Sequence, residues 1–242
     1  MAVTINGQVV LIVGASSGIG RAAALLFSRD GATVVAAARR EDRLRALKEE
    51  LAGEHRDITV QCADASIMTD MVQLTQKTLE RFGKIDVLVF ASGTNTPNRA
   101  MEHLQPGLWS SIIDVNLNGA FYATHAVLPS MRNAHSGHLI YLSSMAGVAP
   151  DLSGAAYQAS KRGIIGLAHA VRTEEQQNGI RVSVICPGLV NTELVQKRPE
   201  KLDAEVLAKA LQPEDVAEMI LNISKMPRRA VASEVHLLPT FQ

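Results

Sequence analysis

Short runs of apolar, mainly β-branched residues recur along this chain, and each is followed by a longer segment with helical spacing. One such segment, 42–53, has leucines three or four positions apart, and another, 70–83, ends at Gly83. Runs that are apolar at every position predict strands buried on both faces. The predicted strands are 8–13, 33–38, 58–63, 85–91, 138–143, 181–187 and 234–239.

This alternation of strand and helix continues through the chain without a linker or a low-complexity stretch. Such alternation is typical of a parallel sheet with right-handed crossovers and helices on both faces. A length of 242 residues would suit one large domain or two small ones, but no composition change marks a boundary. We therefore expect one doubly wound α/β domain of Rossmann type, 1–242, with a seven-stranded, mostly parallel sheet.

Composition excludes several classes of partner. Hydrophobic residues make up 47% of the chain, enough for a substantial core, and the 24 basic residues balance the 24 acidic ones. A nucleic-acid-binding domain would carry a basic excess. The N-terminal segment lacks the pattern of a signal peptide, and no apolar run approaches the roughly 20 residues that span a bilayer. We expect a cytoplasmic protein that binds neither nucleic acid nor membrane.

Cysteine and histidine usage predicts no metal site. The two cysteines, Cys62 and Cys186, each fall in a predicted strand, which favours small buried core residues. The seven histidines are scattered, without cysteines or carboxylates at ligand spacing.

The first predicted strand runs directly into "VGASSGIG", and a helix-forming stretch follows that stops at Gly31. Glycines at such a turn let the backbone approach a pyrophosphate, and the helix N-terminus offers free N–H groups with partial positive charge. The glycine spacing alone is a weak signal, but its position after the first strand favours dinucleotide binding. The predicted contacts in this turn are Gly14, Ser16, Ser17, Gly18, Ile19 and Gly20.

The end of the second strand, "AAARRED", indicates which dinucleotide is bound. A carboxylate at the strand tip would bind the ribose 2′-hydroxyl of NAD, whereas an arginine favours the 2′-phosphate of NADP. Here Arg39 follows the tip, and we assign it to that phosphate. Arg40 is either a second phosphate contact or part of a solvated charge run. The coenzyme predicted is NADP.

The motifs "VGASSGIG", "CADAS", "DVLVFASG", "DVNLNG", "IYLSSMAG", "YQASK" and "CPGLVNT" occur in the order and spacing of a known family. In this respect nearly the whole chain resembles the short-chain dehydrogenases/reductases. The C-terminal "SEVHLLPTFQ" is similar to a branch that contains hydroxy-acid dehydrogenases and the clavulanic-acid dehydrogenase.

The resemblance implies an NADP-dependent oxidoreductase that interconverts a carbonyl and a secondary or primary alcohol. Tyr157 would be the general acid or base, and Lys161 would hold the nicotinamide ribose and depress the pKa of the tyrosine. Ser144, thirteen residues before Tyr157, would hold the substrate oxygen, and this spacing selects it over Ser143. Asn116 would support a water relay that ends at Lys161.

The chemistry of "YQASK" is sensible by itself. Residues four apart share a helix face, so Lys161 can lie beside Tyr157. An ammonium about 4–5 Å from the phenol would contribute about 3–4 kcal/mol, which would bring the pKa of Tyr157 towards working pH. Ser144 would polarise the substrate carbonyl as negative charge develops on its oxygen.

Further coenzyme contacts are implied by the resemblance. Asp64 would contact the adenine, although it could equally serve as a helix N-cap, as could Ser66. The implied contacts outside the glycine turn are Asp64, Ala65, Gly93, Tyr157, Lys161, Pro187, Gly188, Val190 and Thr192.

The chain departs from the family pattern at two places. Val13 stands where the family usually has threonine, and "FASG", from Phe90 to Gly93, stands where it has Asn-Asn-Ala-Gly. The first and fourth strands are neighbours in the expected sheet, so both departures fall at adjacent strand ends. We interpret them as one coupled replacement of polar ties by apolar packing.

The segment 189–211 follows a strand end that should border the active site, and we expect it to be a mobile substrate lid. Arg99, after the fourth strand, could meet a substrate carboxylate, but a surface charge is the favoured interpretation. The residues expected to form an apolar pocket are Met145, Leu152, Leu189, Val190, Leu194 and Val195.

Two helix-like segments, 116–128 and the one after Tyr157, are rich in small residues that permit close helix contact. Relatives commonly assemble through these helices, so we expect a homotetramer, with a dimer as the second choice.

Two rival functions stay open: a catalytically idle NADP-binding regulator or scaffold, and a 3-oxoacyl-(acyl-carrier-protein) reductase. The reductase predicts a basic docking patch, for which Lys197, Arg198 and Lys201 are candidates, interrupted by Glu200.

Overall fold

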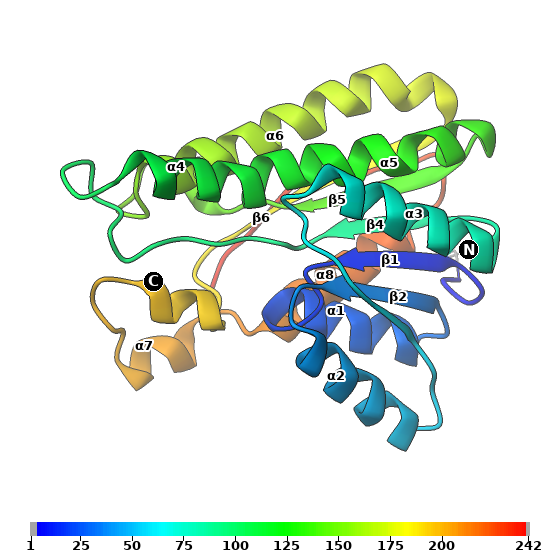
Figure 1. Ribbon diagram of the computed structural model, residues 1–242, viewed down its shortest axis with the longest axis horizontal. Coiled ribbons are helices and arrows are strands. Elements are labelled where there is room, and N and C mark those ends of the chain that lie inside the picture. The colour runs from blue at the N-terminus through cyan, green and yellow to red at the C-terminus, as the bar shows by residue number, and fades with distance from the viewer. Residues whose placement is uncertain (1–3, 241–242) are drawn as a thin grey trace.

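A computed structural model describes residues 4–240, and its seven strands join one sheet in the order β3-β2-β1-β4-β5-β6-β7 (Figure 1). Every neighbouring pair is parallel, so the sheet is parallel throughout rather than mostly so. The strands are β1 (Val9–Val13), β2 (Thr33–Ala38), β3 (Thr59–Cys62), β4 (Val87–Phe90), β5 (Gly137–Leu142), β6 (Ile180–Pro187) and β7 (Glu234–Leu237).

Helices cover both faces of the sheet, as predicted, with α1, α2 and α8 on one face and α3, α5 and α6 on the other (Figure 1). Both layers therefore exclude water from the strands, which explains why the strand sequences are apolar at every position. The α-helices are α1 (Gly18–Arg29), α2 (Glu41–Gly53), α3 (Met68–Phe82), α4 (Pro106–Ile113), α5 (Gly119–Asn133), α6 (Ala155–Glu175), α7 (Ala204–Lys209) and α8 (Pro213–Ser224).

Strand β1 shows how consecutive apolar residues of one strand enter the two cores on opposite faces of the sheet. Val10 and Ile12 enter the core under α1, α2 and α8, while Leu11 and Val13 enter the core under α3, α5 and α6. Side chains alternate between the two faces of a strand, so an unbroken apolar run supplies both cores at once. The edge strand β3 is the exception, since it is only partly covered.

The two departures from the family pattern are direct neighbours in the sheet. Val13 of β1 pairs with Phe90 of β4, and both side chains are at most 1% exposed in the same apolar cluster. The Phe90 ring also fits against Gly119, where an added Cβ would lie 3.1 Å from the ring tip. This arrangement supports the interpretation that packing has replaced polar ties at these strand ends.

One expectation about small residues is wrong. Cys62 is exposed, because it ends the edge strand β3, whereas Cys186 is buried as expected. The small residues Gly119, Ala120 and Ala123 of α5 are buried against this chain's own sheet, and the contact between copies expected from the two helices stays a prediction.

Among residues 4–240, no helix combines the length and apolarity needed to cross a bilayer. The extent of the domain and the function of 189–211 as a lid stay predictions.

Candidate functional site

A cavity of about 480 Å³ opens at the carboxyl ends of the central strands. Crossover connections leave such an opening beside the strand ends of a parallel sheet, where ligands of this fold class bind. Of the catalytic and coenzyme-contact residues predicted from the sequence, only Gly20 and Asn116 do not line it. Those lining it are Gly14, Ser16, Ser17, Gly18, Ile19, Arg39, Arg40, Asp64, Ala65, Gly93, Ser144, Tyr157, Lys161, Pro187, Gly188, Val190 and Thr192.

The glycine turn forms one end of this cavity. Gly14 has φ +97°, and a Cβ there would lie 2.6 Å from the backbone nitrogen of Ser92. Gly20 contacts the same turn from inside α1, where a Cβ would lie 2.3 Å from the Gly14 carbonyl oxygen. Side chains would fill this cradle, so only glycines leave the backbone and the start of α1 open to a pyrophosphate. The turn fits a dinucleotide.

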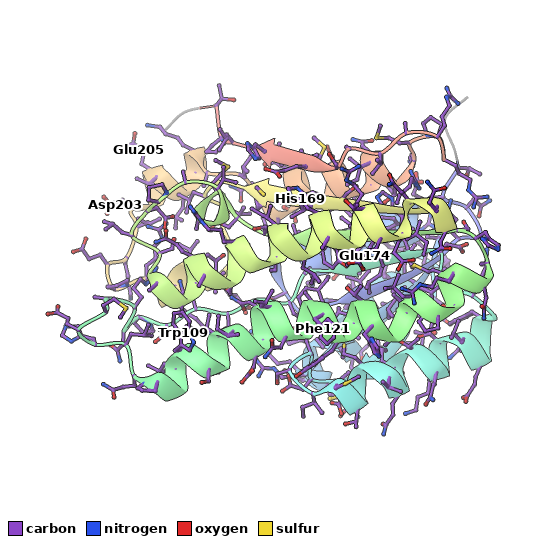
Figure 2. All side chains as sticks on the ribbon, turned by 90° about the horizontal axis from the view of Figure 1, so that it is seen from above. Trp109, Phe121, His169, Glu174, Asp203 and Glu205 are labelled. Carbon is purple, nitrogen blue, oxygen red and sulfur yellow. The ribbon has the colours of Figure 1, made fainter. Side chains whose placement is uncertain are left out.

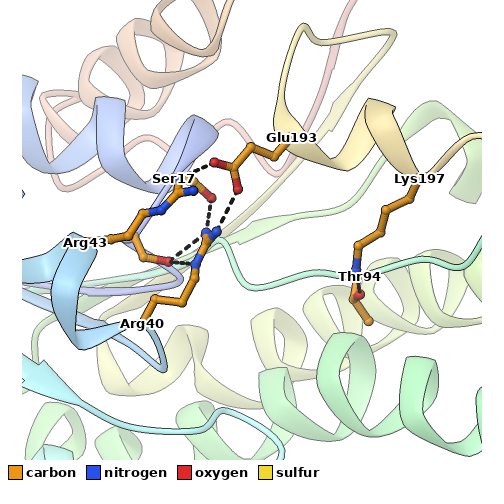
Figure 3. A network of polar contacts seen from close by, with 7 residues as sticks. Ser17, Arg40, Arg43, Thr94, Glu193 and Lys197 are labelled. Carbon is orange, nitrogen blue, oxygen red and sulfur yellow. Dashed lines mark hydrogen bonds and ion pairs between the residues drawn. The ribbon is translucent and has the colours of Figure 1, made fainter. Parts of the chain in front are cut away.

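Arg40 reaches across this end of the cavity, as Figure 3 shows. Its Nη2 donates to the Ser17 hydroxyl at 2.6 Å and to the Ser16 hydroxyl at 3.0 Å. Its Nη1 pairs with the Glu193 carboxylate at 2.7 Å, and Arg43 pairs with the same carboxylate. The hydrogen bonds from Arg40 and Arg43 hold the pKa of Glu193 below its usual value. Arg40 is therefore a structured part of the site, and not only a solvated charge.

Arg39 lies on the outer side of the same end. Its side chain is 62% exposed, and Nη1 is 3.6 Å from a carboxylate oxygen of Asp64. The other oxygen of Asp64 accepts from the backbone nitrogen and hydroxyl of Ser66, at 2.9 and 2.7 Å. Helix α3 begins later, at Met68, so neither side chain caps it.

Tyr157 and Lys161 project from α6 on the same side, as their spacing predicts. The Lys161 ammonium lies 5.6 Å from the centre of the Tyr157 ring and donates a 2.8 Å hydrogen bond to the Leu142 carbonyl. That carbonyl ends β5, so Lys161 ties α6 to the sheet. Lys161 is only 4% exposed, whereas Tyr157 keeps partial access because it lines the cavity.

Burial, rather than Lys161, dominates the acidity of the phenol. It raises the pKa of Tyr157 to about 12, and a hydrogen bond with Ser144 offsets only part of this rise. Burial also lowers the pKa of Lys161 to about 8. The expectation that Lys161 brings the phenol close to neutral pH is therefore wrong for the protein without coenzyme, because loss of hydration disfavours both charged forms.

The two neighbouring serines have different partners. The Ser143 hydroxyl is buried and donates to the Lys161 carbonyl at 2.8 Å. The Ser144 hydroxyl accepts from the Ala146 backbone nitrogen at 3.2 Å and is the one that meets Tyr157. The structure thus brings Ser144, the residue selected by the thirteen-residue spacing, to the phenol.

Asn116 lies behind the cavity wall and is fully buried. It sits in a π-helical turn, Asp114–Asn118, a widened turn that often occurs at functional sites. Its amide accepts from the Thr94 nitrogen at 2.7 Å and donates to the Thr94 carbonyl at 3.0 Å and the Ser160 hydroxyl at 2.9 Å. A Cβ on Gly93 would lie 3.4 Å from the Lys161 ammonium and 3.8 Å from the Asn116 oxygen, so Gly93 keeps the space between them open.

The segment 189–211 is tied down at both ends. The Leu211 nitrogen donates to the Leu189 carbonyl at 3.0 Å, and the Asn191 nitrogen donates to the Leu211 carbonyl at 2.8 Å. Between them, the Lys197 ammonium reaches Thr94 at 2.7 Å across the cavity (Figure 3). Leu152, expected in the apolar pocket, is 95% exposed and does not line the cavity. The remaining pocket residues, Met145, Leu189, Val190, Leu194 and Val195, do line it.

Arg99 is not the surface charge that was favoured from the sequence. It is 9% exposed and lines the cavity. Its Nε donates to the Thr96 carbonyl at 3.1 Å and its Nη2 to the Lys197 carbonyl at 2.5 Å. The loop after β4 folds back under 189–211, which removes the side chain from bulk water. Arg43 and Glu193 were missed as well, since nothing in the sequence signals a pairing across 150 positions.

Comparison with known proteins gives one consistent family. The family model described as short chain dehydrogenase matches residues 8–203. A curated relative, 3-oxoacyl-[acyl-carrier-protein] reductase FabG of Thermotoga maritima, is 31% identical and covered over 96% of both chains. A metagenomic short-chain oxidoreductase solved in complex with NADP is 31% identical, with a TM-score of 0.85, over 99% of this chain and 100% of that one. The alcohol dehydrogenase of Thermococcus sibiricus, complexed with 5-hydroxy-NADP, is 28% identical, with a TM-score of 0.88 over 98% of both chains.

Proposed function

This chain belongs to the short-chain dehydrogenase/reductase family of oxidoreductases, and on that premise we propose that it interconverts a carbonyl and a secondary or primary alcohol with NADP(H). The observation that carries the proposal is the meeting of Ser144, Tyr157 and Lys161 in one cavity with the glycine cradle. This combination supplies a proton donor, an oxygen-binding hydroxyl and a dinucleotide site within one enclosed space.

In the reduction, Tyr157 donates its phenolic proton to the substrate oxygen. A bound nicotinamide coenzyme supplies the hydride. With a pKa of about 12, Tyr157 is protonated at neutral pH and ready to act as the acid. The Ser144 hydroxyl donates a hydrogen bond to the same oxygen as negative charge develops on it.

Lys161 and Asn116 support the proton donor. With a pKa of about 8, Lys161 is mainly charged at neutral pH, and its charge stabilises the phenolate left after proton transfer. The Lys161 ammonium and the Asn116 amide both lie close to Gly93, and a water held between these two groups would return the proton. Asn116 also holds Thr94, so it fixes the wall of the site.

NADP is favoured over NAD by the cationic groups at the far end of the cavity. Arg39 and Arg40 offer guanidinium groups for the 2′-phosphate, and Ser17 adds a hydroxyl beside Arg40. The NADP complex of the metagenomic relative supports this choice. The other proposed coenzyme contacts are Gly14, Ser16, Gly18, Ile19, Gly20, Asp64, Ala65, Gly93, Pro187, Gly188, Val190 and Thr192.

A second candidate is reduction of an acyl-carrier-protein thioester, supported by the name of the Thermotoga maritima relative. That function needs a basic docking patch outside the cavity. Lys197 instead bonds to Thr94, and both Lys197 and Arg198 line the cavity, which leaves Lys201 as the candidate outside it in this segment. We therefore favour a small-molecule substrate. A catalytically idle NADP-binding regulator is the remaining alternative. Measuring turnover of carbonyl substrates distinguishes it from an enzyme.

We also propose self-association, as a homotetramer first and a dimer second. Helices α4, α5 and α6 form one side of the molecule, where Trp109 and Phe121 point outward (Figure 2). Trp109 is 39% exposed and Phe121 is 46% exposed, which favours a partner on this side. Light scattering of Phe121→Glu beside the natural protein tests this, and an unchanged mass would remove the support.

The test of the proposed function begins with binding of NADPH and NADH to the purified protein. NADPH oxidation is then followed at 340 nm with aldehydes, ketones and 3-oxo acids. Tyr157→Phe should bind NADPH normally but lose at least ~1000-fold in kcat/KM, because no other group replaces the proton donor. Tyr122→Phe, on the exterior helix α5, is the matched control. Absence of NADPH binding would disprove the proposal, and binding without turnover on any carbonyl would favour the regulator.

A further inference from the structure

Arg99 is a buried cation without an acidic partner among the residues that the structure describes. Within residues 4–240, no carboxylate lies within ion-pair distance of Arg99 or of Arg198, which lines the same cavity. Arginines that are nine-tenths buried normally have a carboxylate or phosphate against them. The two hydrogen bonds from Nε and Nη2 engage only two of the five N–H groups of Arg99.

The fold holds Arg99 beside the proton donor. Asn95 donates to the Ser153 carbonyl at 3.0 Å, which joins the loop after β4 to the start of α6. Gly154 then packs against the Arg99 backbone: it has φ +91°, and a Cβ there would lie 2.6 Å from the Arg99 Cβ. Gly154 lies three residues before Tyr157, so a close contact that requires glycine sets the position of Arg99 relative to the catalytic helix.

Arg198 brings a second positive charge to the same wall. It directly follows the short 3₁₀ turn Glu193–Lys197. Burial lowers the pKa of Arg99 most, and the positive charge of Arg198 lowers it next. The two guanidinium groups therefore repel each other. Both arginines also oppose the burial-driven rise in the pKa of Tyr157. Two like charges beside one cavity repel, and an anion placed between them removes that cost.

Asp151 is the one acidic side chain of this wall whose charge reaches Arg99 and Tyr157, among the residues described. Its oxygens already accept from the backbone nitrogen and hydroxyl of Ser153, at 2.8 and 2.7 Å. The Asp151 carboxylate is thus held by its own loop and does not neutralise Arg99.

We propose that the substrate is an oxo acid whose carboxylate binds Arg99 and Arg198 while its carbonyl oxygen meets Ser144 and Tyr157. This inference rests on the proposed carbonyl reduction and names its substrate class. A planar guanidinium matches a carboxylate and orients it as well as attracting it. The apolar side chains of Met145, Leu194 and Val195, in the same cavity, suit the short carbon chain between the two oxygen-bearing groups.

The first experiment compares each acid with its own methyl ester: acetoacetate with methyl acetoacetate, and levulinate with methyl levulinate. The natural enzyme should prefer the acid in kcat/KM. In Arg198→Gln and Arg99→Met that preference should fall by roughly 10- to 100-fold, the range expected for a hydrogen bond to a charged group. An effect through the pKa of Tyr157 changes acid and ester turnover alike and cancels in this comparison, and Arg99→Lys should retain part of the preference. Lys201→Gln, in the same segment but outside the cavity, is the control.

Arg99→Met could fail to fold, because Arg99 also holds the Thr96 and Lys197 carbonyls. Arg198→Gln avoids this difficulty, since its side chain is exposed at the cavity edge. An equal preference for acid and ester in the natural enzyme would overturn the inference and leave carbonyl reduction intact. The inference would also be overturned if Arg198→Gln and a folded Arg99→Met both kept the natural preference for the acid over the ester.

A binding experiment separates this inference from the proposed function. The fluorescence of the enzyme–NADPH complex is titrated with butyrate and with butyramide, neither of which needs to react. Butyrate should bind at least ~10-fold more tightly, and Arg198→Gln should abolish the difference. This result would support the anion site even if no carbonyl were reduced. Equal binding of the two, or binding of neither, would overturn it.

Discussion

The two ends of the cavity handle charge in opposite ways. At the end formed by the glycine turn, Arg40, Arg43 and Glu193 are each more than 40% exposed and neutralise one another. At the end near α6, Lys161 and Arg99 are nearly buried and have no carboxylate partner in the described chain. Of the charges in these two groups, the exposed ones are paired with each other and the buried ones have no ion-pair partner within residues 4–240. The usual rule, that burial requires pairing, is reversed within one cavity.

The pKa shifts at the two ends of the cavity also have different causes. The largest influence on Glu193 is the hydrogen bond from Arg40, which lowers its pKa. The largest influence on Tyr157 and on Lys161 is burial, which raises the first pKa and lowers the second. Neighbours therefore determine acidity at the exposed end, and loss of hydration determines it at the buried end. A site whose buried cations lack internal partners is prepared for charge that a ligand brings.

The largest effect should come from restoring a polar residue at the buried end. Phe90→Asn removes a ring packed against Val13 and Gly119 and leaves an amide without partners, so the free energy of unfolding should fall by about 3–5 kcal/mol. Urea unfolding measures the change. Val206→Asn, at a position that is 42% exposed in α7, should have little effect and serves as the control.

The same position tests whether the two departures are coupled. Val13→Thr together with Phe90→Asn should be less destabilising than the sum of the single changes, because the threonine hydroxyl then faces an amide across β1 and β4. Strict additivity would show that the two departures are independent replacements.

A smaller, pH-dependent effect is expected at Lys161. Below pH 8 its charge is present in both folded and unfolded chains, and burying that charge costs the folded state. Because folding lowers the pKa of Lys161 from 10.5 to about 8, the unfolded chain holds the extra proton between these values, so stability rises with pH there. The contribution is about 3 kcal/mol. It should be absent in Lys161→Met.

The measurement is the difference in unfolding free energy between Lys161→Met and the natural protein, at pH 7 and at pH 10.5. Other titrating groups cancel in this difference. The variant should gain relative stability at pH 7 and lose that advantage at the higher pH. A difference that does not change with pH would mean that burial does not control this lysine.

The smallest effect belongs to the exposed end. Glu193→Gln should change stability by less than ~0.5 kcal/mol, since exposed ion pairs contribute little. NADPH should bind a few-fold more tightly than before, because Arg40 and Arg43 lose a competing carboxylate, while NADH binding stays the same. The gain should shrink as salt rises to about 0.5 M. Glu41→Gln, which breaks the exposed pair with Arg45, is the control, and an equal gain there would refute the idea of competition.

Much of the architecture could be predicted because it depends on local pattern. The seven apolar runs became the seven strands, with ends displaced by at most a few residues, and Gly83 ends α3 in the left-handed conformation that glycine favours. Tyr157 and Lys161 share a helix face because four residues make about one helical turn. The spacing from Ser144 to Tyr157 selected the serine that meets the phenol.

The sequence by itself determined the order of strands and helices, the glycine turn and the pairing of Tyr157 with Lys161, because each follows from spacing along the chain. Only the tertiary structure decided that Arg99 is buried, that Cys62 is exposed and that Glu193 meets Arg40 and Arg43. These depend on which distant segments share an edge of the sheet. The acidity of Tyr157 belongs with them, since hydration is a property of the whole environment and not of the residue four positions away.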